Sequence, residues 1–293
     1  MIDLHLHSNA SDGLDTPQQL VQKASNLNLK AIALTDHDTI DGIEEFLLAG
    51  EEKRIITLSG IEFSIKHEPE REIRDVHIVG LNIDPSSSYL INILKKQREG
   101  RIQQKKEICK RLAQELGYKI TFEEVKSIAQ SDTIGRPHIV EVLIRNNSER
   151  LQTFTKDQIF KMISLGGEAY IDRKFEVSLE RSIEVIKRAQ GIPILAHPGI
   201  YEVSDRKNFV ELCINAGIEG IEIQYPYNKN RPYVGTEKAE WAQQYLPKYY
   251  HNLANQFNLI KSGGSDYHGG KKGLKIGEVE VPDSYLEKIL EKF

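Results

Sequence analysis

The sequence is poor in the features that mark secreted and membrane proteins. Its 293 residues include two cysteines, Cys109 and Cys213, each in a helical pattern, so we expect two small buried side chains and no disulfide or thiolate site. The longest apolar runs, such as residues 192–196, are far too short to cross a bilayer. The N-terminus lacks the basic and apolar regions of a signal peptide. These absences predict a cytoplasmic protein that does not bind membranes.

The remaining composition is that of an ordinary globular protein, with 39% hydrophobic and 28% charged residues. Its length fits one large barrel-type domain, or one domain with an insertion. The net charge of -4 is uneven, because residues 85–165 hold 15 Lys and Arg against 9 Asp and Glu, whereas the rest holds 24 against 34. Such a charge run is usually a solvated helical face. It also fits a basic surface that attracts a polyanionic substrate.

Short apolar runs alternate with amphipathic helical patterns, which favours an α/β architecture with parallel strands. The predicted strands are Ile2–Leu6, Ala31–Leu34, Ile55–Leu58, Val76–Leu81, Ile192–Ala196, Ile218–Ile223 and Leu259–Ser262. Between residues 86 and 165 the strand signal disappears, and long charged helical patterns replace it. We therefore expect a barrel of residues 1–84 and 166–293. A mostly helical insertion of residues 85–165 would contribute to substrate binding.

The strand that opens the chain carries two histidines. Successive side chains of a strand point to opposite faces, so Asp3, His5 and His7 share one face. Two imidazoles one strand repeat apart can bind one metal ion, and Asp3 could orient one of them by accepting its second N–H. A lone histidine on a strand is usually structural, so this pair alone only suggests a metal site.

The same kind of residue recurs near the other predicted strands. The positions concerned hold Asp36-His37-Asp38, Glu62, His77, His197, Asp266 and His268. In barrels of parallel strands, the C-terminal strand ends meet at one mouth, where catalytic groups collect. Six of the nine histidines fall at such places, whereas His67 and His251 do not. Scattered structural histidines would not be distributed in this way.

The donor types restrict the chemistry. A set rich in nitrogen and carboxylate, without cysteine, suits Zn²⁺, Mn²⁺ or Fe²⁺. The ligands are too many for one ion, so we expect a cluster. Such clusters are typical of phosphoester hydrolysis, where the metals generate hydroxide and hold the phosphate oxygens. With Asp12, Glu62 and Asp266 as charged ligands, three dications would leave a net charge of about +3, which attracts phosphate.

Six ordered motifs resemble the PHP (polymerase and histidinol phosphatase) family. They are MIDLHLHSNASDG, ALTDHDT, GIEFS, DVHIVG, ILAHPG and GGSDYHG, and they extend from residue 1 to about residue 270. They are most similar to its stand-alone bacterial branch of nucleotide phosphoesterases and 5′-to-3′ exonucleases. The resemblance implies a distorted (β/α)7 TIM-like barrel with three divalent metal ions, which would be Mn, Zn or Fe.

The resemblance also implies the metal ligands. The first metal ion would be bound by His5, His7, Glu62 and Asp266. The second would be bound by His77, His197 and Glu62, which bridges the two ions. The third would be bound by Asp12, His37 and His268. Many relatives have histidine where this chain has Asp12.

The segment Gly135-Arg136-Pro137-His138 in the insertion is similar to the same branch. Arg136 offers a planar set of donors for phosphate, and His138 could donate a hydrogen bond or a proton. From spacing alone, a turn in which the arginine caps a carbonyl is an equal alternative. The residues expected to act in catalysis are Asp12, His37, Arg136, His138 and His197.

These features predict an enzyme that hydrolyses a phosphomonoester, with metal-bound hydroxide as the nucleophile. We expect the substrate group to be the 3′-phosphate of nucleoside 3′,5′-bisphosphates, with removal of 5′-nucleotides from short oligonucleotides as an allied activity. The alternatives are a histidinol-phosphatase-like small-molecule phosphatase, a non-catalytic or proofreading module of a polymerase, and an amidohydrolase. The basic insertion argues against the small-molecule phosphatase, and the complete ligand set argues against the polymerase module. The lack of a lysine that matches the carbamylated lysine of amidohydrolases argues against the third. No obligate protein partner is evident.

Overall fold

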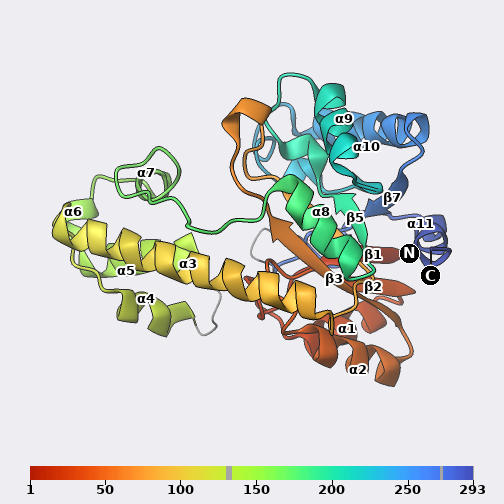
Figure 1. Cartoon of the computed structure of the whole chain (residues 1–293), viewed down its shortest axis with the longest axis horizontal. Helices are drawn as coiled ribbons and strands as arrows, with labels where there is room; N and C mark the ends of the chain where they lie inside the picture. Colours follow the sequence, from red (N-terminus) through yellow and green to blue (C-terminus); the bar gives the residue numbers. More distant parts are fainter. Residues whose placement is uncertain (130–133, 271–272, 293) are drawn as a thin grey trace. The chain divides into compact units, whose positions relative to one another are not determined.

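The structure is a computed structural model that describes residues 1–129, 134–270 and 273–292. The chain forms two compact units, one of residues 1–93 and 177–293 and the other of residues 94–176. Figure 1 labels helices of both units and some of the strands of the first. Among the described helices, none is both long enough and apolar enough to cross a membrane.

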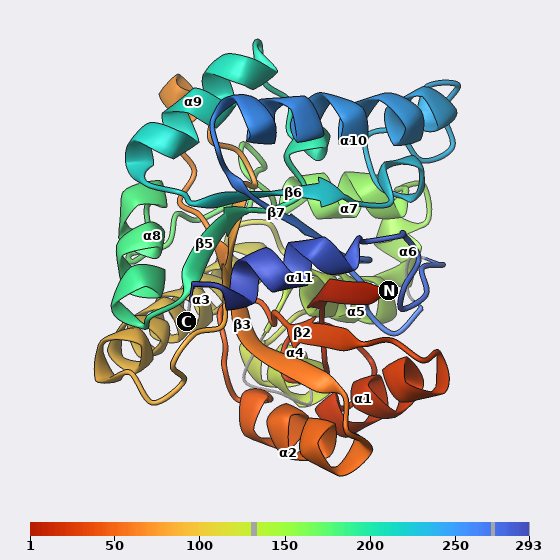
Figure 2. The ribbon, with the colours of Figure 1, turned by 90° about the vertical axis from the view of Figure 1, so that its right-hand side faces the viewer.

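The first unit is built around seven strands that pair in chain order. They are β1 (Ile2–Leu6), β2 (Ala31–Leu34), β3 (Ile56–Ser64), β4 (His77–Leu81), β5 (Ile192–Leu195), β6 (Gly220–Gln224) and β7 (Ile260–Gly263). The segment after β7 returns to β1, since Tyr267 O accepts from His7 N and His5 O accepts from Asp266 N, both at 3.0 Å. The sheet is therefore a nearly closed barrel (Figure 2), which confirms the predicted α/β barrel.

One strand departs from the predicted parallel arrangement. β4 runs antiparallel to both β3 and β5, whereas the other neighbouring pairs are parallel. The connection between β3 and β4 contains a single short 3-10 turn, Pro69–Arg71, where a parallel pair would need a crossover. Ile65 N donates to Val76 O, and Glu68 pairs with Ile73, so β3 and β4 form one long hairpin. The expectation of a fully parallel sheet was wrong at this strand.

In its described residues, six α-helices complete the first unit. They are α1 (Pro17–Asn26), α2 (Ile43–Lys53), α8 (Leu179–Arg188), α9 (Arg206–Ala216), α10 (Ala239–Gln256) and α11 (Asp283–Leu290). In α1, the Thr16 hydroxyl accepts a hydrogen bond from Gln19 N, and the Gln19 side chain accepts one from Thr16 N. Leu20 and Val21 of α1 are fully buried. Local capping thus starts the helix, and burial of its apolar face stabilises it.

Polar residues share the barrel core with apolar ones. All five residues of β1 are buried, including Asp3 and His5. His5 contacts carboxylates of β3 and β6, so the polar face of β1 looks into the barrel. Burying such groups is costly unless they are paired. The fold therefore maintains a polar interior at one end of the strands.

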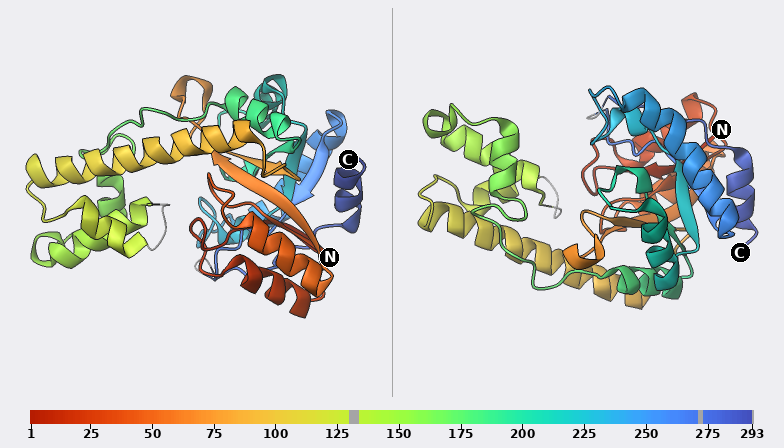
Figure 3. Two further views of the ribbon diagram at one scale, coloured as in Figure 1. Left: turned by 60° about the horizontal axis from the view of Figure 1, so that its bottom comes forward. Right: turned by 90° about the horizontal axis from the view of Figure 1, so that it is seen from above.

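The second unit is helical in the part that the structure describes. α3 (Ser88–Gln114) leads into it, followed by α4 (Phe122–Ala129), α5 (Arg136–Asn146), α6 (Ser148–Leu151) and α7 (Lys156–Met162), coloured yellow to green in Figure 3. Ile108, Val125 and Ile159 belong to a buried apolar cluster of its own. Cys109 lies in this cluster and Cys213 is buried in α9, and both are free thiols as predicted.

Candidate metal centre

The first strand brings two histidines into contact. His5 Nε2 and His7 Nε2 lie 3.1 Å apart, and both side chains are buried. Asp3 does not orient either ring, so that prediction was wrong. Its carboxylate instead accepts hydrogen bonds from Ser265 N at 2.9 Å and Gly277 N at 2.8 Å. Asp3 therefore ties β1 to the chain that follows β7.

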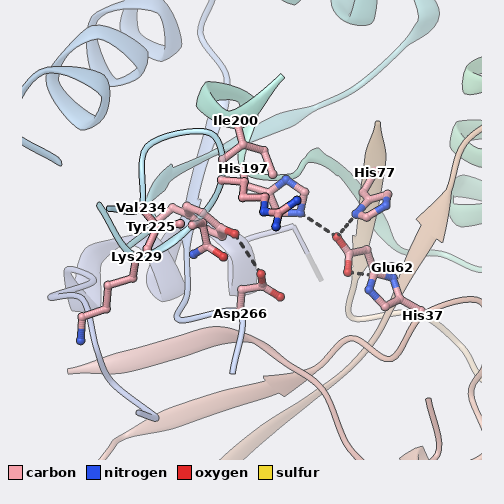
Figure 4. A pocket seen from close by; sticks show the side chains of 11 residues that line it. His37, Glu62, His77, His197, Ile200, Tyr225, Lys229, Val234 and Asp266 are labelled. Carbon is pink, nitrogen blue, oxygen red and sulfur yellow. Dashed lines mark hydrogen bonds and ion pairs between the residues drawn. The ribbon is translucent and has the colours of Figure 1, made fainter. Parts of the chain in front are cut away.

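Glu62, in β3, lies at the centre of the histidines. Its Oε1 is 2.9 Å from His77 Nδ1 and 3.0 Å from His197 Nε2. Its Oε2 lies 3.1–3.2 Å from ring nitrogens of His5, His7 and His37. One fully buried carboxylate is thus surrounded by five imidazoles, three of which appear with it in Figure 4.

The remaining predicted ligands come from loops at the same end of the barrel. Asp266 Oδ1 is 3.3 Å from His7 Nε2. His268 Nε2 is 3.2 Å from Asp12 Oδ1, and its Nδ1 is 3.4 Å from Asp266 Oδ1. The rings of His7 and His268 stack, with centroids 4.1 Å apart. These contacts join the loop after β1 to the loop after β7.

All nine residues implied as ligands by the resemblance converge in the structure. They fall into four overlapping groups within which the ligand atoms lie no more than 4.8 Å apart: His7, Asp12, His37 and His268; His5, His7 and Asp266; His5, Glu62 and His197; His37, Glu62 and His77. Glu62 belongs to two groups, which is what a carboxylate that bridges two ions requires. The division of the ligands among three ions stays a prediction.

The cluster has features that fit metal ions. Glu62 Oε2 and His37 Nδ1 lie 3.1 Å apart, yet neither atom makes a hydrogen bond in the described part of the chain. Burial alone would lower the pKa of His7, but Asp266 and Glu62 raise it to about 9. The carboxylates therefore favour positive charge beside them, which divalent ions would supply. Imidazole and carboxylate donors without thiolate suit Zn²⁺, Mn²⁺ or Fe²⁺.

Sequence reasoning missed the carboxylate that orients two of these histidines. Glu222, in β6, places Oε1 3.1 Å from His5 Nδ1, and its Oε2 accepts a hydrogen bond from His197 N at 2.7 Å. A metal-binding histidine usually presents its second ring nitrogen to such a group. Glu222 therefore occupies the position expected for Asp3. The available signal was an acidic residue between Ile221 and Ile223 in a buried strand.

A second carboxylate supports the loop that carries Asp12. Asp36, directly after β2, accepts hydrogen bonds from Ser8 N at 2.7 Å and from the hydroxyls of Ser8 and Ser11. The Asp36-His37-Asp38 motif was recognised from its position after a strand, but Asp36 had no predicted role. Its contacts assign it to loop positioning, because all three donors belong to the segment between β1 and Asp12.

A cavity of about 560 Å³ opens beside the cluster. Figure 4 shows its wall, where His37, Glu62 and Asp266 face Val234 of the loop before α10. Tyr225 is buried at this wall, and its hydroxyl donates to Asp266 Oδ2 at 2.9 Å. The size suits a small phosphorylated ligand.

Two of the predicted ligands have strained backbones. His197 has φ 26° and Asp266 has φ 51°, in the left-handed region that residues with a Cβ rarely adopt. Such strain costs on the order of 1–3 kcal/mol and is concentrated at functional sites. Surrounding hydrogen bonds hold the strained loop in place, including the one that His197 N donates to Glu222 Oε2.

Arg136 and His138 belong to the second unit, where they begin α5. Arg136 is exposed, and its Nη1 donates to Ser164 Oγ at 3.1 Å, so within the described residues its acceptor is a hydroxyl. His138 Nδ1 accepts from Gly135 N at 3.1 Å. The imidazole therefore caps the start of α5 through Nδ1.

Other cations lie near Arg136 within the second unit. Lys105 is buried, with Nζ 3.0 Å from Gln104 Oε1. Burial lowers the pKa of Lys105 well below its usual range, and the charges of Arg173, Arg101 and Arg136 lower it further. This part of the unit has a positive field that would favour an anion.

Two histidines lie apart from the cluster, as the sequence indicated. His67 is in the β3–β4 hairpin, and His251 is in α10, where its Nδ1 lies 3.5 Å from the Tyr285 hydroxyl. Neither belongs to a group of potential metal ligands among the described residues. They offer matched controls for the histidines of the centre.

Comparison with known proteins places this site among phosphoesterases. A family model described as "PHP domain" matches residues 3–255. The chain is 30% identical to a 5′-3′ exoribonuclease of Haemophilus influenzae, over 99% of this chain and 98% of the relative. It is 29% identical to a 3′,5′-nucleoside bisphosphate phosphatase of Chromobacterium violaceum, over 95% and 91%. A candidate metal-dependent phosphoesterase of Bifidobacterium adolescentis has a similar structure, with a TM-score of 0.78, 27% identity, and coverage of 99% and 96%.

Proposed function

This chain belongs to the PHP domain family and is a metal-dependent phosphoesterase, and we propose that it removes the 3′-phosphate from nucleoside 3′,5′-bisphosphates. The observation that carries the proposal is the position of Glu62. Each of its two oxygens faces a different set of imidazoles, so the carboxylate is suited to bridge two ions. A multinuclear centre of this kind is suited to phosphoester hydrolysis.

The three ion positions that we propose follow the ligand sets implied by the resemblance. The first uses His5, His7, Glu62 and Asp266, the second Glu62, His77 and His197, and the third Asp12, His37 and His268. When bound, Mn, Zn or Fe ions at these positions supply an activated water and neutralise charge on the phosphoryl oxygens. Glu222 and Tyr225 hold His5 and Asp266 by the contacts described above, so the ligand atoms need little rearrangement before the reaction.

The insertion, residues 85–165, is the part that we propose recognises the second phosphate. Arg136 has a planar set of donors that stays charged at any working pH, and His138 could add a hydrogen bond or a proton. The positive field around Lys105 in this unit supports the proposal, since a bisphosphate carries more negative charge than a simple monophosphate. The phosphate ester of a small alcohol carries a single phosphate, so it has no second phosphate for these cations to bind.

A second candidate activity is removal of 5′-nucleotides from short RNA or DNA. The supporting observation is the Haemophilus influenzae relative named as a 5′-3′ exoribonuclease, which aligns with nearly the whole chain. Both activities use the same metal centre and a nucleotide with two phosphate groups. Phosphate release from 3′,5′-bisphosphates, compared with nucleotide release from short oligonucleotides, measures their relative rates. Failure of both substrates to react with metal-loaded enzyme would contradict the proposed function.

Substitution of Arg136 tests the role of the insertion. Arg136→Ala should lower kcat/KM for a nucleoside 3′,5′-bisphosphate by roughly 10- to 150-fold, because a charge-assisted contact contributes about 1.5–3 kcal/mol. It should barely change hydrolysis of a small chromogenic monophosphate, which has no second phosphate. Arg145→Ala is the control, because Arg145 lies in the same helix and is exposed. Equal losses on the two substrates would assign Arg136 to the reacting phosphoryl group or to the fold.

A further inference from the structure

The outer face of α10 carries a ladder of aromatic rings that the proposed reaction does not use. Trp241 and Tyr245 stack with ring centroids 5.0 Å apart and an interplanar angle of 16°, and Tyr245 and Tyr249 stack at 5.7 Å and 25°. Trp241 is 45% exposed and Tyr245 44%. Among the described residues, Phe154 is the other aromatic side chain with similar exposure. A packing role would bury these rings, so their exposure points to a ligand.

Helix geometry places the rings in one row. Residues four apart lie one turn apart on the same face, so the ladder extends about 12 Å along α10. Stacked bases lie about 3.4 Å apart, so this length accommodates more than one base. The rings are already ordered by stacking on one another, which lowers the entropy cost of binding a flat ligand.

The charges beside the ladder suit an anionic ligand. At about 100° per residue, Lys238 and Lys248 fall on the same face as the rings. Neither lysine pairs with a carboxylate in the described part of the chain. The acidic residue of α10 is Glu240, which points about 100° away from Trp241. The face therefore combines exposed aromatic rings with two lysines. Its acidic neighbours are Glu237, next to Lys238, and Asp205, whose charge acts on Tyr249.

The ladder is continuous with the wall of the active-site cavity. The Tyr233 ring lies 6.3 Å from that of Trp241, and its hydroxyl donates to Gly199 O at 2.9 Å, two residues after His197. The next residue, Val234, lines the cavity and is 47% exposed. Figure 2 shows α10 running beside β6, whose C-terminal end leads into this loop. A chain that leaves the cavity over Val234 would reach Trp241 first.

We propose that Trp241, Tyr245 and Tyr249, with Lys238 and Lys248, form a stacking surface for a single-stranded oligonucleotide. Its terminal nucleotide would occupy the cavity, and the bases that follow would lie on the rings. This inference rests on the proposed function, because the occupant must enter the same metal centre. Aromatic rings stack on any base and lysines contact phosphates, so binding is independent of sequence and weakens as salt increases.

The sequence provides a built-in reporter, since Trp241 is its single tryptophan. Metal-loaded protein is titrated with a hydrolysis-resistant hexa-adenylate that carries 2′-O-methyl groups and phosphorothioate linkages, and Trp241 emission is recorded. The oligonucleotide should change the emission saturably, and its affinity should fall as salt increases. A nucleoside 3′,5′-bisphosphate, which is too short to reach the ladder, should leave the emission unchanged. Unchanged emission while a labelled hexa-adenylate binds by anisotropy would overturn the proposal.

Tyr245→Ala keeps the reporter and removes the middle ring. It should weaken hexa-adenylate binding about 5- to 150-fold, the range expected for one base–aromatic stack. Phe154→Ala, which removes an exposed ring in the second unit, should bind as the wild type does. Equal affinity of Tyr245→Ala and the wild type would reject the surface. Concentration-dependent sedimentation that Tyr245→Ala abolishes, without an oligonucleotide effect, would assign the ladder to self-association instead.

The two proposals fail in different ways. Phosphate release from a nucleoside 3′,5′-bisphosphate does not require the ladder and tests the proposed function. The emission change requires no turnover and tests the ladder. A wild-type enzyme that hydrolyses the bisphosphate but shows no emission change with hexa-adenylate retains the proposed function and loses the stacking surface.

Discussion

At the scale of single residues, the site depends on carboxylates that are surrounded by imidazoles. Burial opposes the charged form of Glu62, yet His37, His77 and His5 hold the pKa of that carboxyl well below its usual range. A buried carboxylate can stay ionised only where positive charge or hydrogen-bond donors compensate for lost hydration. Glu62 is therefore the residue whose removal should disturb the centre most.

Loss of this charge gives a direct test. Glu62→Gln and His197→Ala should each lower kcat/KM by at least about 100-fold. Mutation of residues that only support metal ligands already lowers metal affinity or activity 10- to 100-fold. Circular dichroism should show an intact fold. His67→Ala and His251→Ala serve as controls and should stay close to the wild type. If His67→Ala were as inactive as Glu62→Gln while folded, the site map would be wrong.

Glu222 tests whether orientation of a histidine matters. In Glu222→Gln, the side-chain amide has one oxygen and one NH₂ group, but both positions face N–H donors, His5 Nδ1–H and His197 N. In either orientation, the NH₂ group therefore lies against one of these donors. We expect a 10- to 100-fold loss in metal affinity or activity. Metal titration of the purified variant measures the affinity. Glu240→Gln, on the exposed side of α10, is the control, and metal binding equal to wild type in both variants would remove Glu222 from the centre.

At the scale of elements, the antiparallel course of β4 explains how His77 reaches the centre. The parallel strands present their C-terminal ends at the mouth, whereas an antiparallel strand presents its first residue there. His77 is the first residue of β4 and pairs with Ser64, close to Glu62. The hairpin thus delivers a histidine from the start of a strand to the position that other ligands reach from strand ends.

The junction of β7 and β1 depends on close approach at Gly264. A Cβ at Gly264 would lie 2.5 Å from His5 N, closer than backbone and side chain can tolerate. Gly264→Ala should therefore destabilise the fold by about 1–3 kcal/mol, measured by urea denaturation, and should also weaken metal binding because His5 must move. Gly166→Ala is the control, because its Cβ meets open space although φ is +78°. It should lower stability by about 1 kcal/mol and leave metal binding intact.

At the scale of the whole molecule, the chain forms two compact units, and the second has a hydrophobic core of its own. The nine candidate ligands all lie in the first unit, and the Arg136 segment lies in the second. The charges are divided in the same way: the insertion has a surplus of basic residues, whereas the rest of the chain has a surplus of acidic ones. In the function that we propose, the first unit performs the chemistry and the second attracts an anionic substrate.

Metal removal should affect the two units unequally. An excess of chelator should abolish activity and lower the melting temperature, because ions that bind only the folded state stabilise it by about 2.7 kcal/mol at 100 times Kd. Elemental analysis of purified protein should find up to three transition ions per chain. In hydrogen-exchange measurements, β1, β3 and β7 should lose protection, whereas residues 94–129 should keep theirs. Full turnover in metal-free buffer would contradict the metal centre itself.

The barrel strands, the helical character of the insertion and the ligand-type residues at the strand ends could be predicted from short stretches of sequence, and the family resemblance implied the full ligand set. These follow from local information, since strand alternation, apolar runs and ligand-type residues at strand ends are visible in short windows. The roles of Glu222 and Asp36 were not visible, because an acidic residue in a strand gains its partner only when distant strands meet. Asp3 was assigned to a ring by proximity along the strand, whereas the fold supplies Ser265 and Gly277 as donors.

The direction of β4 and the arrangement of the ligands depend on contacts between distant parts of the chain. An apolar run of five residues reads the same in a parallel and an antiparallel strand, and the connecting segment decides between them. Likewise, nine ligand-type residues spread over 264 positions gain a common position only through barrel closure at His7 and Tyr267. The chemical character of a side chain can be read from its position in the sequence, whereas the distance between remote residues depends on how the chain folds.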